Sequence, residues 1–407
     1  MFNSQKTTMF QHVEFFAGDP ILSLNEAFLA DPRPEKVNLS IGIYADDQAR
    51  LPALDAVHQA ELRLAAANTA KPYLPSEGAS NFRGAVQALL FGASHEVVTS
   101  RRAATVQSVG SSGGLKLGAE FIKRWFPGSG VWVSNPTWDP HRAMFQSAGI
   151  EVREYPYFEN GGGVCFDAML SALDALPAHS VVLLHACCHN PTGADLTRDQ
   201  WITLIDLLKA RQLIPYLDLA YQGFADGIEE DAFAVRALAA AGLSFLVANS
   251  FSKSMGLYGE RCGALTVVCP DAEQAERVLG QLKATARRTY SSPPIHGGQI
   301  VAMILTDPKL RDPWEKDLER MRTRIQAMRA QLHAALVRRH PAGKFGYLLS
   351  QRGMFSYTGL SAVQVDQLRD EHAIYLVRSG RICIAGLNTS NVEIVAQAIA
   401  KKLEHAR

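Results

Sequence analysis

The sequence predicts an α/β fold: a large domain with a mostly parallel central sheet flanked by helices, plus a smaller α+β domain built from both termini. Short apolar runs alternate with amphipathic segments through the middle of the chain, which is typical of a parallel sheet covered on both faces. The chain has 407 residues, enough for roughly two or three domains. Its 47% hydrophobic and 20% charged residues are typical of a globular protein and exclude a disordered one.

The candidate strands are short apolar runs separated by helical or polar segments. Ligands of parallel sheets bind beyond the carboxyl ends of the strands. We therefore expect the binding site in the segments that directly follow these runs. The runs are 104–109, 130–134, 151–155, 181–185, 214–218, 245–250 and 262–268.

Amphipathic segments predict helices between and after the strands. In 113–126 the apolar residues recur at helical spacing. Segment 198–211 follows Thr197, which forms a capping box with Gln200. Apolar residues in 307–340 recur every three or four positions, as in a coiled-coil seam, but the run is short, which favours a single long helix packed on its own protein.

We expect three divisions of the chain. Residues 1–49 form an N-terminal arm and part of the small domain, 50–325 the large domain, and 326–407 the C-terminal small domain. The long helix predicted in 307–340 would then bridge the two domains.

Charge and targeting features exclude several classes of partner. The formal net charge is +1, which gives no electrostatic basis for binding nucleic acid or an anionic membrane. The long uncharged stretches are interrupted by proline, histidine or glycine, so no transmembrane segment is expected. The N-terminus lacks the features of a signal peptide, and the 6 cysteines are scattered without a CxxC motif. We expect a cytoplasmic protein with reduced thiols and no metal in its site.

Two short motifs suggest serine chemistry. Residues 110–114 satisfy G-x-S-x-G, which would make Ser112 a hydrolase nucleophile. Residues 250–253 satisfy S-x-x-K, but the companion motifs S-D-N and K-T-G are absent. A Gly/Ser-rich turn from strand to helix is also an anion site suited to phosphate. The hydroxyls of Ser111, Ser112, Ser250 and Ser252, with the guanidinium of Arg261, could complete that site.

Lys253 follows the run 245–250 and lies in the segment SFSKSMGLYGERCG. Its neighbours are small, aromatic or apolar, and Arg261 is the other cation close by. A lysine that is desolvated beside another cation has a lowered pKa and can form Schiff bases as a neutral amine. The alternative is an ordinary solvated side chain.

Four further residues are candidates for a cofactor or substrate site. Asp218 ends a buried run, where a carboxylate is costly unless paired; it fits either a cap or the protonated ring nitrogen of pyridoxal phosphate. Tyr221 could bind the phenolate oxygen of the same ring. Asn190 lies in an NPTG segment that on its own indicates a turn. Arg381 fits either a surface ion pair or a substrate carboxylate.

Together these segments strongly resemble the fold-type I pyridoxal-phosphate-dependent aminotransferases. The resemblance is to the bacterial branch that holds aspartate and aromatic amino acid (tyrosine) aminotransferases, and it runs from about Met9 to the end of the chain. The segments that carry it are AGDPIL, VNLSIGIY, YLPSEG, SNPTW, CCHNPTG, DLAYQGF, SFSKSMGLYGERCG, YSSPP, RGMFSYTGL and SGRICIAGL.

The resemblance implies that pyridoxal 5'-phosphate is the cofactor. Lys253 would hold it as a Schiff base and then move a proton between substrate and cofactor, and Asp218 would pair with the pyridinium nitrogen. Tyr221 and Asn190 would bond the ring oxygen, while Trp138 stacks on the ring. The residues implied for the phosphate are Ser111, Ser112, Ser250, Ser252, Arg261 and Tyr73, the last reaching across a dimer interface.

The same resemblance implies a substrate site shared between two subunits. Arg381 would bind the α-carboxylate, with Gly42 over it. Arg287 would reach across the homodimer to a distal carboxylate. Trp138 and Asn190 would also contact the substrate.

The implied activity is that of a transaminase (EC 2.6.1 class) with amino acid and 2-oxo acid substrates. It would move the amino group of aromatic amino acids (Tyr, Phe) and aspartate to 2-oxoglutarate by a ping-pong mechanism. Ser112 and Ser292 match the aromatic branch, whereas Ala45 and Pro72 match neither branch. The alternatives are an aspartate-specific aminotransferase, another pyridoxal phosphate reaction, or a serine hydrolase that uses Ser112.

Overall fold

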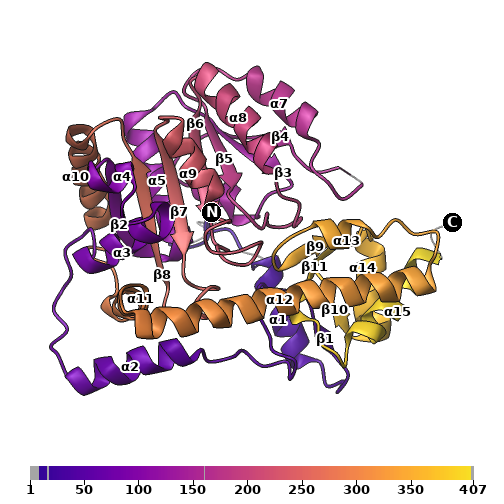
Figure 1. The fold of residues 1–407 in the computed structure, drawn as a ribbon. Helices are drawn as coiled ribbons and strands as arrows, with labels where there is room; N and C mark the ends of the chain where they lie inside the picture. Colours follow the sequence, from indigo (N-terminus) through magenta and orange to yellow (C-terminus); the bar gives the residue numbers. More distant parts are fainter. Residues whose placement is uncertain (1–8, 16–17, 160, 405–407) are drawn as a thin grey trace, which may run out of the picture.

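The structure is a computed structural model that describes residues 9–15, 18–159 and 161–404. Residues 1–8, which extend beyond the start of the resemblance, lie outside the described part. The centre is a seven-stranded sheet with the order β2-β8-β7-β6-β5-β3-β4 (Figure 1). The strands are β2 (Ala103–Val109), β3 (Val131–Asn135), β4 (Val152–Pro156), β5 (Val181–His185), β6 (Ile214–Leu219), β7 (Phe245–Ser250) and β8 (Cys262–Val268).

The predicted strands are confirmed, each within one residue of its predicted ends. β8 runs antiparallel to both of its neighbours, and the other neighbouring strands are parallel. Alternate residues of a strand point to opposite sides of the sheet, so buried residues at successive positions show that both faces are covered. In β5, Val181 and Leu183 belong to one core cluster, and Val182 and Leu184 belong to the other.

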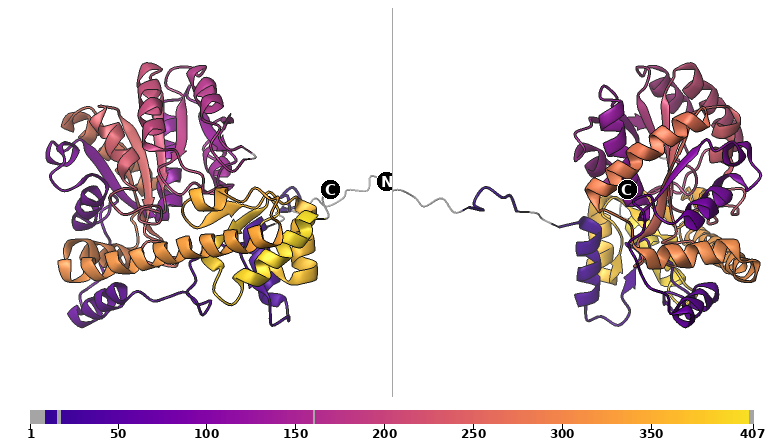
Figure 2. Two further views of the ribbon diagram at one scale, coloured as in Figure 1. Left: turned by 45° about the vertical axis from the view of Figure 1, so that its right-hand side comes forward. Right: turned by 90° about the vertical axis from the view of Figure 1, so that its left-hand side faces the viewer.

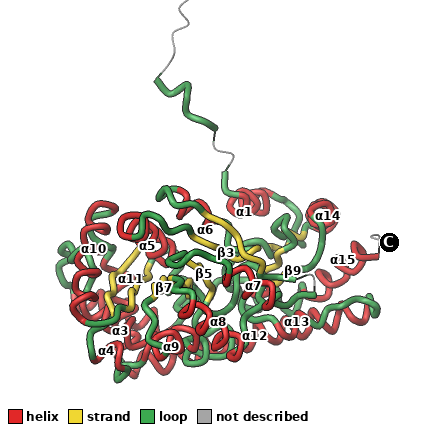
Figure 3. The backbone as a smooth tube through the Cα atoms, turned by 90° about the horizontal axis from the view of Figure 1, so that it is seen from above, coloured by secondary structure: helices red, strands yellow, loops and turns green. Residues whose placement is uncertain are grey.

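Helices cover both faces of the sheet, as Figure 3 shows from above. On one face lie α5 (Gly110–Trp125), α6 (Pro140–Gln146) and α10 (Ala272–Thr289). The other face packs against α3 (Ser80–Phe91), α7 (Phe166–Asp174), α8 (Arg198–Ala210), α9 (Phe233–Ala240) and α11 (Ile295–Thr306). The predicted mostly parallel sheet with helices on both sides is therefore confirmed.

The structure confirms the predicted capping box and corrects one helix start. The capping box of α8 is present: Gln200 N donates to Thr197 Oγ1 (3.2 Å), and Thr197 N donates to Gln200 Oε1 (2.9 Å). The start predicted at residue 113 is wrong, because α5 begins at Gly110. Gly110 turns the chain from strand to helix with a φ of 66°, so the small residues after it form the first helical turn.

The long helix α12 (Pro308–Arg339) confirms the single helix predicted over 307–340. Its repeated apolar residues are buried against the same chain, which removes the coiled-coil alternative. Figure 2 shows α12 running from the seven-stranded part of the molecule to the C-terminal elements. The predicted domain boundary at 325 falls inside this helix.

The two ends of the chain meet in a smaller group of elements. β1 (Val37–Asn38) pairs in parallel with β10 (Ile374–Tyr375), and β9 (Phe355–Tyr357) pairs antiparallel with β11 (Arg381–Cys383). A small domain built from both termini requires such pairing, although its boundaries stay a prediction. Around them lie α1 (Pro20–Ala30), α13 (Tyr347–Ser350), α14 (Ala362–His372), η1 (Ile384–Gly386) and α15 (Val392–Glu404).

Two helices remain, α2 (Asp55–Ala67) and α4 (Glu96–Thr99). Within the described ranges, no helix has both the length and the apolar character required to cross a membrane.

Candidate active site

A cavity of about 230 Å³ lies at the carboxyl ends of the central strands, where the sequence predicts a ligand site. All of the predicted site residues except Tyr73 and Arg287 line it. They come from strand ends, from the first turn of α5 and from the N- and C-terminal segments. They are Gly42, Ser111, Ser112, Trp138, Asn190, Asp218, Tyr221, Ser250, Ser252, Lys253, Arg261 and Arg381.

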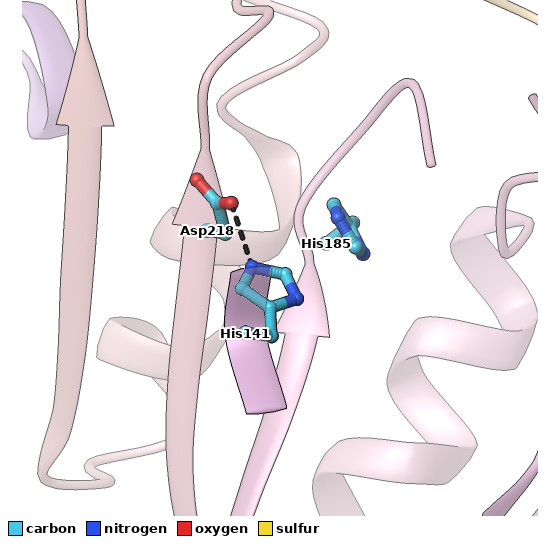
Figure 4. Close-up of side chains that lie close together, drawn as sticks. All are labelled: His141, His185 and Asp218. Carbon is cyan, nitrogen blue, oxygen red and sulfur yellow. Dashed lines mark hydrogen bonds and ion pairs between the residues drawn. The ribbon is translucent and has the colours of Figure 1, made fainter. Parts of the chain in front are cut away.

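Asp218, on β6, is buried and is held by a histidine that the sequence analysis missed. His141 Nε2 lies 3.1 Å from Asp218 Oδ2 (Figure 4). On the other side of the ring, His141 Nδ1 lies 2.8 Å from Thr137 Oγ1. Because a carboxylate only accepts hydrogen bonds, His141 Nε2 donates, and in the neutral ring Nδ1 accepts from the threonine hydroxyl. The chain from Thr137 to Asp218 therefore fixes the orientation of the carboxylate.

The second oxygen of Asp218 leaves room for a cationic partner. Burial by itself would raise the pKa of Asp218, but the hydrogen bond from His141 and the charges around it bring the pKa below its ordinary value. The group is therefore an anion. Asp218 Oδ1 is buried without a hydrogen-bond partner in the described part of the chain. A protonated ring nitrogen of a bound cofactor would satisfy this oxygen.

Lys253 follows β7 and places its amine against an aromatic ring. Lys253 Nζ lies 4.9 Å from the centre of the Tyr221 ring. The pKa of Lys253 is lowered to about 8. Burial is the main cause and the positive charge of Arg261 adds to it, while the negative charge of Asp218 opposes the change. A larger fraction of this amine is therefore uncharged near neutral pH than in an exposed lysine, as a nucleophilic amine requires.

The lowered pKa predicts a pH profile for protein freed of its cofactor. Reaction of Lys253 with a small aldehyde, trapped by borohydride, should reach half its maximum near pH 8, because only the neutral amine reacts. Asp218→Asn should move this midpoint to lower pH, since the charge of Asp218 raises the pKa of Lys253. The labelling of Lys253 would be followed by peptide mass spectrometry. A midpoint at the ordinary lysine value of 10.5 in both proteins would contradict the assignment.

The start of α5 forms one wall of an anion site. The turn at Gly110 is tight, because Gly110 N donates to Arg261 O (3.0 Å) and a Cβ on Gly110 would lie 2.7 Å from Arg261 Nη2. The Arg261 side chain therefore lies beside the N-terminus of α5. The first amides of a helix have no partners within it and favour an anion. Ser111 and Ser112 lie in this first turn.

The opposite wall of the anion site comes from the end of β7. Ser250 Oγ donates to Ser252 Oγ (3.0 Å), and Arg261 Nη1 donates to the same Ser252 oxygen (3.3 Å). The serines and the guanidinium therefore converge on one place, and they provide both the hydroxyl donors and the positive charge that a phosphate requires. Together with the helix N-terminus, this set of donors fits the phosphate of pyridoxal phosphate.

Arg381, on β11, forms the other end of the cavity. Its side chain is buried: Arg381 Nη1 donates to Asn190 Oδ1 (3.3 Å), and Arg381 Nη2 donates to Ser40 O (2.5 Å). Arg381 Nε is buried and unpartnered among the described residues. Burial lowers the pKa of Arg381, although the nearby Tyr221 opposes this change. A buried guanidinium without a carboxylate fits the carboxylate of a substrate.

The serine hydrolase alternative finds no support in the geometry. Ser112 lies in the first turn of α5, and no hydrogen bond joins it to a histidine within the described part of the chain. A buried serine that does contact a histidine is Ser134, whose Oγ lies 2.9 Å from His189 Nε2, but Ser134 does not line the cavity. A hydrolytic serine requires a base at this distance.

Tyr73 and Arg287 lie outside the cavity. Tyr73 is 95% exposed in the loop between α2 and α3. Arg287, in the last turn of α10, is exposed and donates to Ser291 Oγ (2.5 Å). One copy of the chain therefore does not bring these two residues to the site.

Several residues that the sequence analysis did not single out line the same cavity. His185 ends β5, and its position at the end of a predicted strand could have indicated it. Phe355 lies in the segment RGMFSYTGL, and Tyr258 in SFSKSMGLYGERCG, both of which were noted only for their resemblance. They line the cavity with Ile21 and Ala220.

The site and the fold fit an enzyme that binds pyridoxal phosphate and a substrate with a carboxylate. The family model for aminotransferase class I and II matches residues 34–399, so the chain belongs to that family. It is a pyridoxal-phosphate-dependent transaminase, and its substrates are small molecules.

Relatives cover nearly the whole chain. The aromatic-amino-acid aminotransferase of Escherichia coli is 59% identical over 394 residues, which are 96% of this chain and 99% of that protein. The aspartate aminotransferase of Pseudomonas aeruginosa is 48% identical over 397 residues, which are 97% of this chain and 100% of that protein. The crystal structure of an aromatic-amino-acid aminotransferase from Burkholderia pseudomallei, covalently bound to pyridoxal phosphate, has a TM-score of 0.95 and 48% identity, and covers 98% of this chain and 100% of its own.

Proposed function

We propose that this transaminase moves the amino group of aromatic amino acids, tyrosine and phenylalanine, and of aspartate to 2-oxoglutarate. The observation that carries the proposal is a single cavity that holds an anion site, the Lys253 amine with its lowered pKa, and the buried guanidinium of Arg381, which has no ion pair with a carboxylate among the described residues. Identities of 59% to the aromatic-amino-acid aminotransferase of Escherichia coli and 57% to the tyrosine aminotransferase of Klebsiella pneumoniae support the aromatic preference. An aspartate-specific enzyme is the alternative.

Pyridoxal phosphate, when bound, supplies an aldehyde that exchanges its oxygen for an amino group and a pyridinium ring that withdraws electrons from the substrate Cα. We assign Lys253 as the amine that holds it covalently and then moves the proton of the substrate Cα. Asp218 keeps a proton on the ring nitrogen. Tyr221 and Asn190 donate to the ring oxygen, and Trp138 covers the ring.

At the two ends of the cavity, the charges orient the ligands. The serines of α5 and β7, with Arg261, hold the phosphate. Arg381 binds the α-carboxylate of the substrate, with Gly42 beside it. These contacts hold the reacting atoms near Lys253 Nζ, which is how binding accelerates the proton transfer.

We also propose that the active unit is a homodimer in the cytoplasm, with Tyr73 and Arg287 of each copy reaching the site of the other. Their exposure in one copy supports this, because neither reaches its own cavity. Exposed apolar side chains near the N-terminus support it as well, since apolar surface of this kind marks an interface. They are Met9, Phe10, Val13 and Phe15.

A complementation experiment tests the shared site. Lys253→Ala and Arg287→Leu proteins should each be inactive with aspartate. After mixing and subunit exchange, about half of the dimers are hybrids, and each hybrid has one site with both residues intact. Activity with aspartate should therefore return to about one quarter of the wild-type value. No recovery despite subunit exchange, confirmed by native mass spectrometry, would contradict the shared site.

Substrate breadth rests on Arg287. Arg287→Leu should lower kcat/KM for aspartate by about 10²-fold or more, because a charged partner of the distal carboxylate is lost. Activity with phenylalanine should change less than about threefold, since burial of the ring contributes roughly 2–3 kcal/mol without that charge. The measurement is kcat/KM for both substrates in both proteins. Equal losses of kcat/KM with the two substrates would show that Arg287 does not contact the substrate side chain. A wild type that is inactive with phenylalanine would favour the aspartate-specific alternative.

A further inference from the structure

A buried arginine lies outside the cavity and has no part in the functions assigned so far. Arg329, in the middle of α12, is 3% exposed, and burial lowers its pKa to about 10. Among the described residues its guanidinium has no hydrogen bond or ion pair with a carboxylate. An apolar side chain of similar size would pack here without the cost of burying a charge. Its hydrogen bonds therefore indicate what the charge is used for.

Within the described part of the chain, the hydrogen bonds of the Arg329 guanidinium all go to one short segment, residues 352–356. Nη1 donates to Ser356 Oγ (2.6 Å), and Nη2 donates to the carbonyl oxygens of Gly353 (2.7 Å), Phe355 (2.6 Å) and Arg352 (3.2 Å). A charged, planar donor set of this kind fixes the path of the backbone more firmly than neutral hydrogen bonds do. Arg329 therefore holds the start of β9 against α12.

The segment that Arg329 holds carries Phe355 into the cavity. The Phe355 ring lies 4.4 Å from the guanidinium of Arg381 and packs edge to face on Tyr221, with ring centres 6.0 Å apart. A Cβ on Gly42 would lie only 2.8 Å from Phe355 Cζ, so the ring also closes against this loop. A shift of the segment would move the ring that faces the guanidinium of Arg381.

The same segment also touches the turn that carries Asn190. Arg352 N donates to Gly193 O (2.7 Å), and a Cβ on Gly193 would lie 2.3 Å from Phe355 O. Phe355 O is also an acceptor for Arg329. Asn190, at the other end of the turn, accepts from Arg381 (3.3 Å). A shift of the segment would thus affect Arg381 through two contacts, one with the Phe355 ring and one with Asn190.

We infer that Arg329 is a positioning residue for substrate binding, which holds residues 352–356 so that Phe355 and Asn190 keep Arg381 oriented toward the α-carboxylate. This inference rests on the proposed role of Arg381. Arg329 does not line the cavity. Its replacement should therefore weaken carboxylate binding and leave the proton transfer at Lys253 largely intact.

The test uses the holoenzyme and 3-phenylpropionate, a carboxylate without an amino group that binds without reacting. Arg329→Lys keeps the charge but loses the planar donor set, and Arg329→Met loses both. The Kd from calorimetry should rise about tenfold in Arg329→Lys and further in Arg329→Met. The KM for phenylalanine should rise similarly, kcat should stay within about threefold, and the absorbance spectrum of the bound cofactor should be unchanged.

Leu332→Ala is the matched control for damage to α12. Leu332 is buried on the same helix, and its truncation lowers the melting temperature by leaving a cavity. We expect its Kd for 3-phenylpropionate to match that of the wild type. A weaker Kd in Leu332→Ala to the same degree as in Arg329→Lys would mean that Arg329 acts only through stability, and the inference would be wrong.

A double-mutant cycle decides whether Arg329 acts through Phe355, even if Arg329→Met fails to fold. The fold-increase in Kd of the Arg329→Lys/Phe355→Ala protein should be smaller than the product of the fold-increases of the two single variants, because both changes disturb the same ring. Fully multiplicative losses, or a wild-type Kd in Arg329→Lys, would overturn the inference. Arg381→Leu separates the role of Arg381 from that of Arg329. If Arg381→Leu binds 3-phenylpropionate as well as the wild type does, the proposed role of Arg381 is rejected. If Arg381→Leu binds weakly and Arg329→Lys binds like the wild type, only the role of Arg329 is rejected.

Discussion

Lys253→Ala should lower transamination by at least about 10⁴-fold with every amino acid, because in the proposed mechanism one amine serves both as the covalent partner of the cofactor and as the proton carrier. The cavity keeps its other contacts, so pyridoxal phosphate should still bind through the anion site and Asp218. The protein should therefore contain the cofactor and have almost no turnover.

The matched control is Lys209→Ala. Lys209 is exposed in the last turn of α8, where its amine donates to Ala241 O (2.9 Å), and it does not line the cavity. Both half-reactions would be followed by stopped-flow absorbance in the two variants. Turnover of Lys253→Ala within about tenfold of the wild type would remove Lys253 from the mechanism.

Asp218→Asn should be the second most damaging change. It keeps the shape of the side chain and removes the buried negative charge that we propose pairs with the protonated ring nitrogen. Removing one partner of a buried charge pair costs about 3–5 kcal/mol, which is about 10²–10⁴-fold in rate if that pair stabilises the transition state. The cofactor should stay bound through Lys253 and the anion site.

Asp218→Glu restores the charge at a slightly different position and should lose less activity than Asp218→Asn. His141→Asn removes the donor to Asp218 Oδ2 but leaves the carboxylate, so it should also be milder. The readout is the rate of proton removal from the substrate Cα, compared between protonated and deuterated substrate. Wild-type rates in Asp218→Asn would show that the charge is not used.

The central sheet was predictable because its strands are buried on both faces. Runs such as 181–185 are apolar at every position but the last, so they are visible without a partner strand. The start of α5 was not predictable, because Gly110 and the serines after it are typical of a loop. Their helical conformation depends on Arg261, which is distant in sequence and fixes the turn through its carbonyl oxygen.

The residues of the site could be predicted where a side chain follows a strand end. Asp218, Ser250 and Lys253 are of this kind, and the structure brings them to one cavity. Phe355 and His141 were missed because their place beside Arg381 and Asp218 results from contacts between distant segments. No spacing in the sequence records such contacts.

Tyr73 and Arg287 show a different limit. They come from the resemblance to the family, not from a local pattern, and one copy of the chain leaves both exposed. In the proposed homodimer, their position relative to a site would depend on a second copy. Only the complementation experiment addresses it directly.

The identity of the lysine that holds the cofactor is the most direct test of the proposed mechanism. Borohydride reduction of the holoenzyme, followed by proteolysis and mass spectrometry, would attach the phosphopyridoxyl group permanently to that lysine. We predict one modified site, Lys253, in the peptide that contains SFSKSMG, and no modification of the Lys253→Ala protein. Modification of another lysine in the wild type, with Lys253 unmodified, would contradict the proposed role of Lys253.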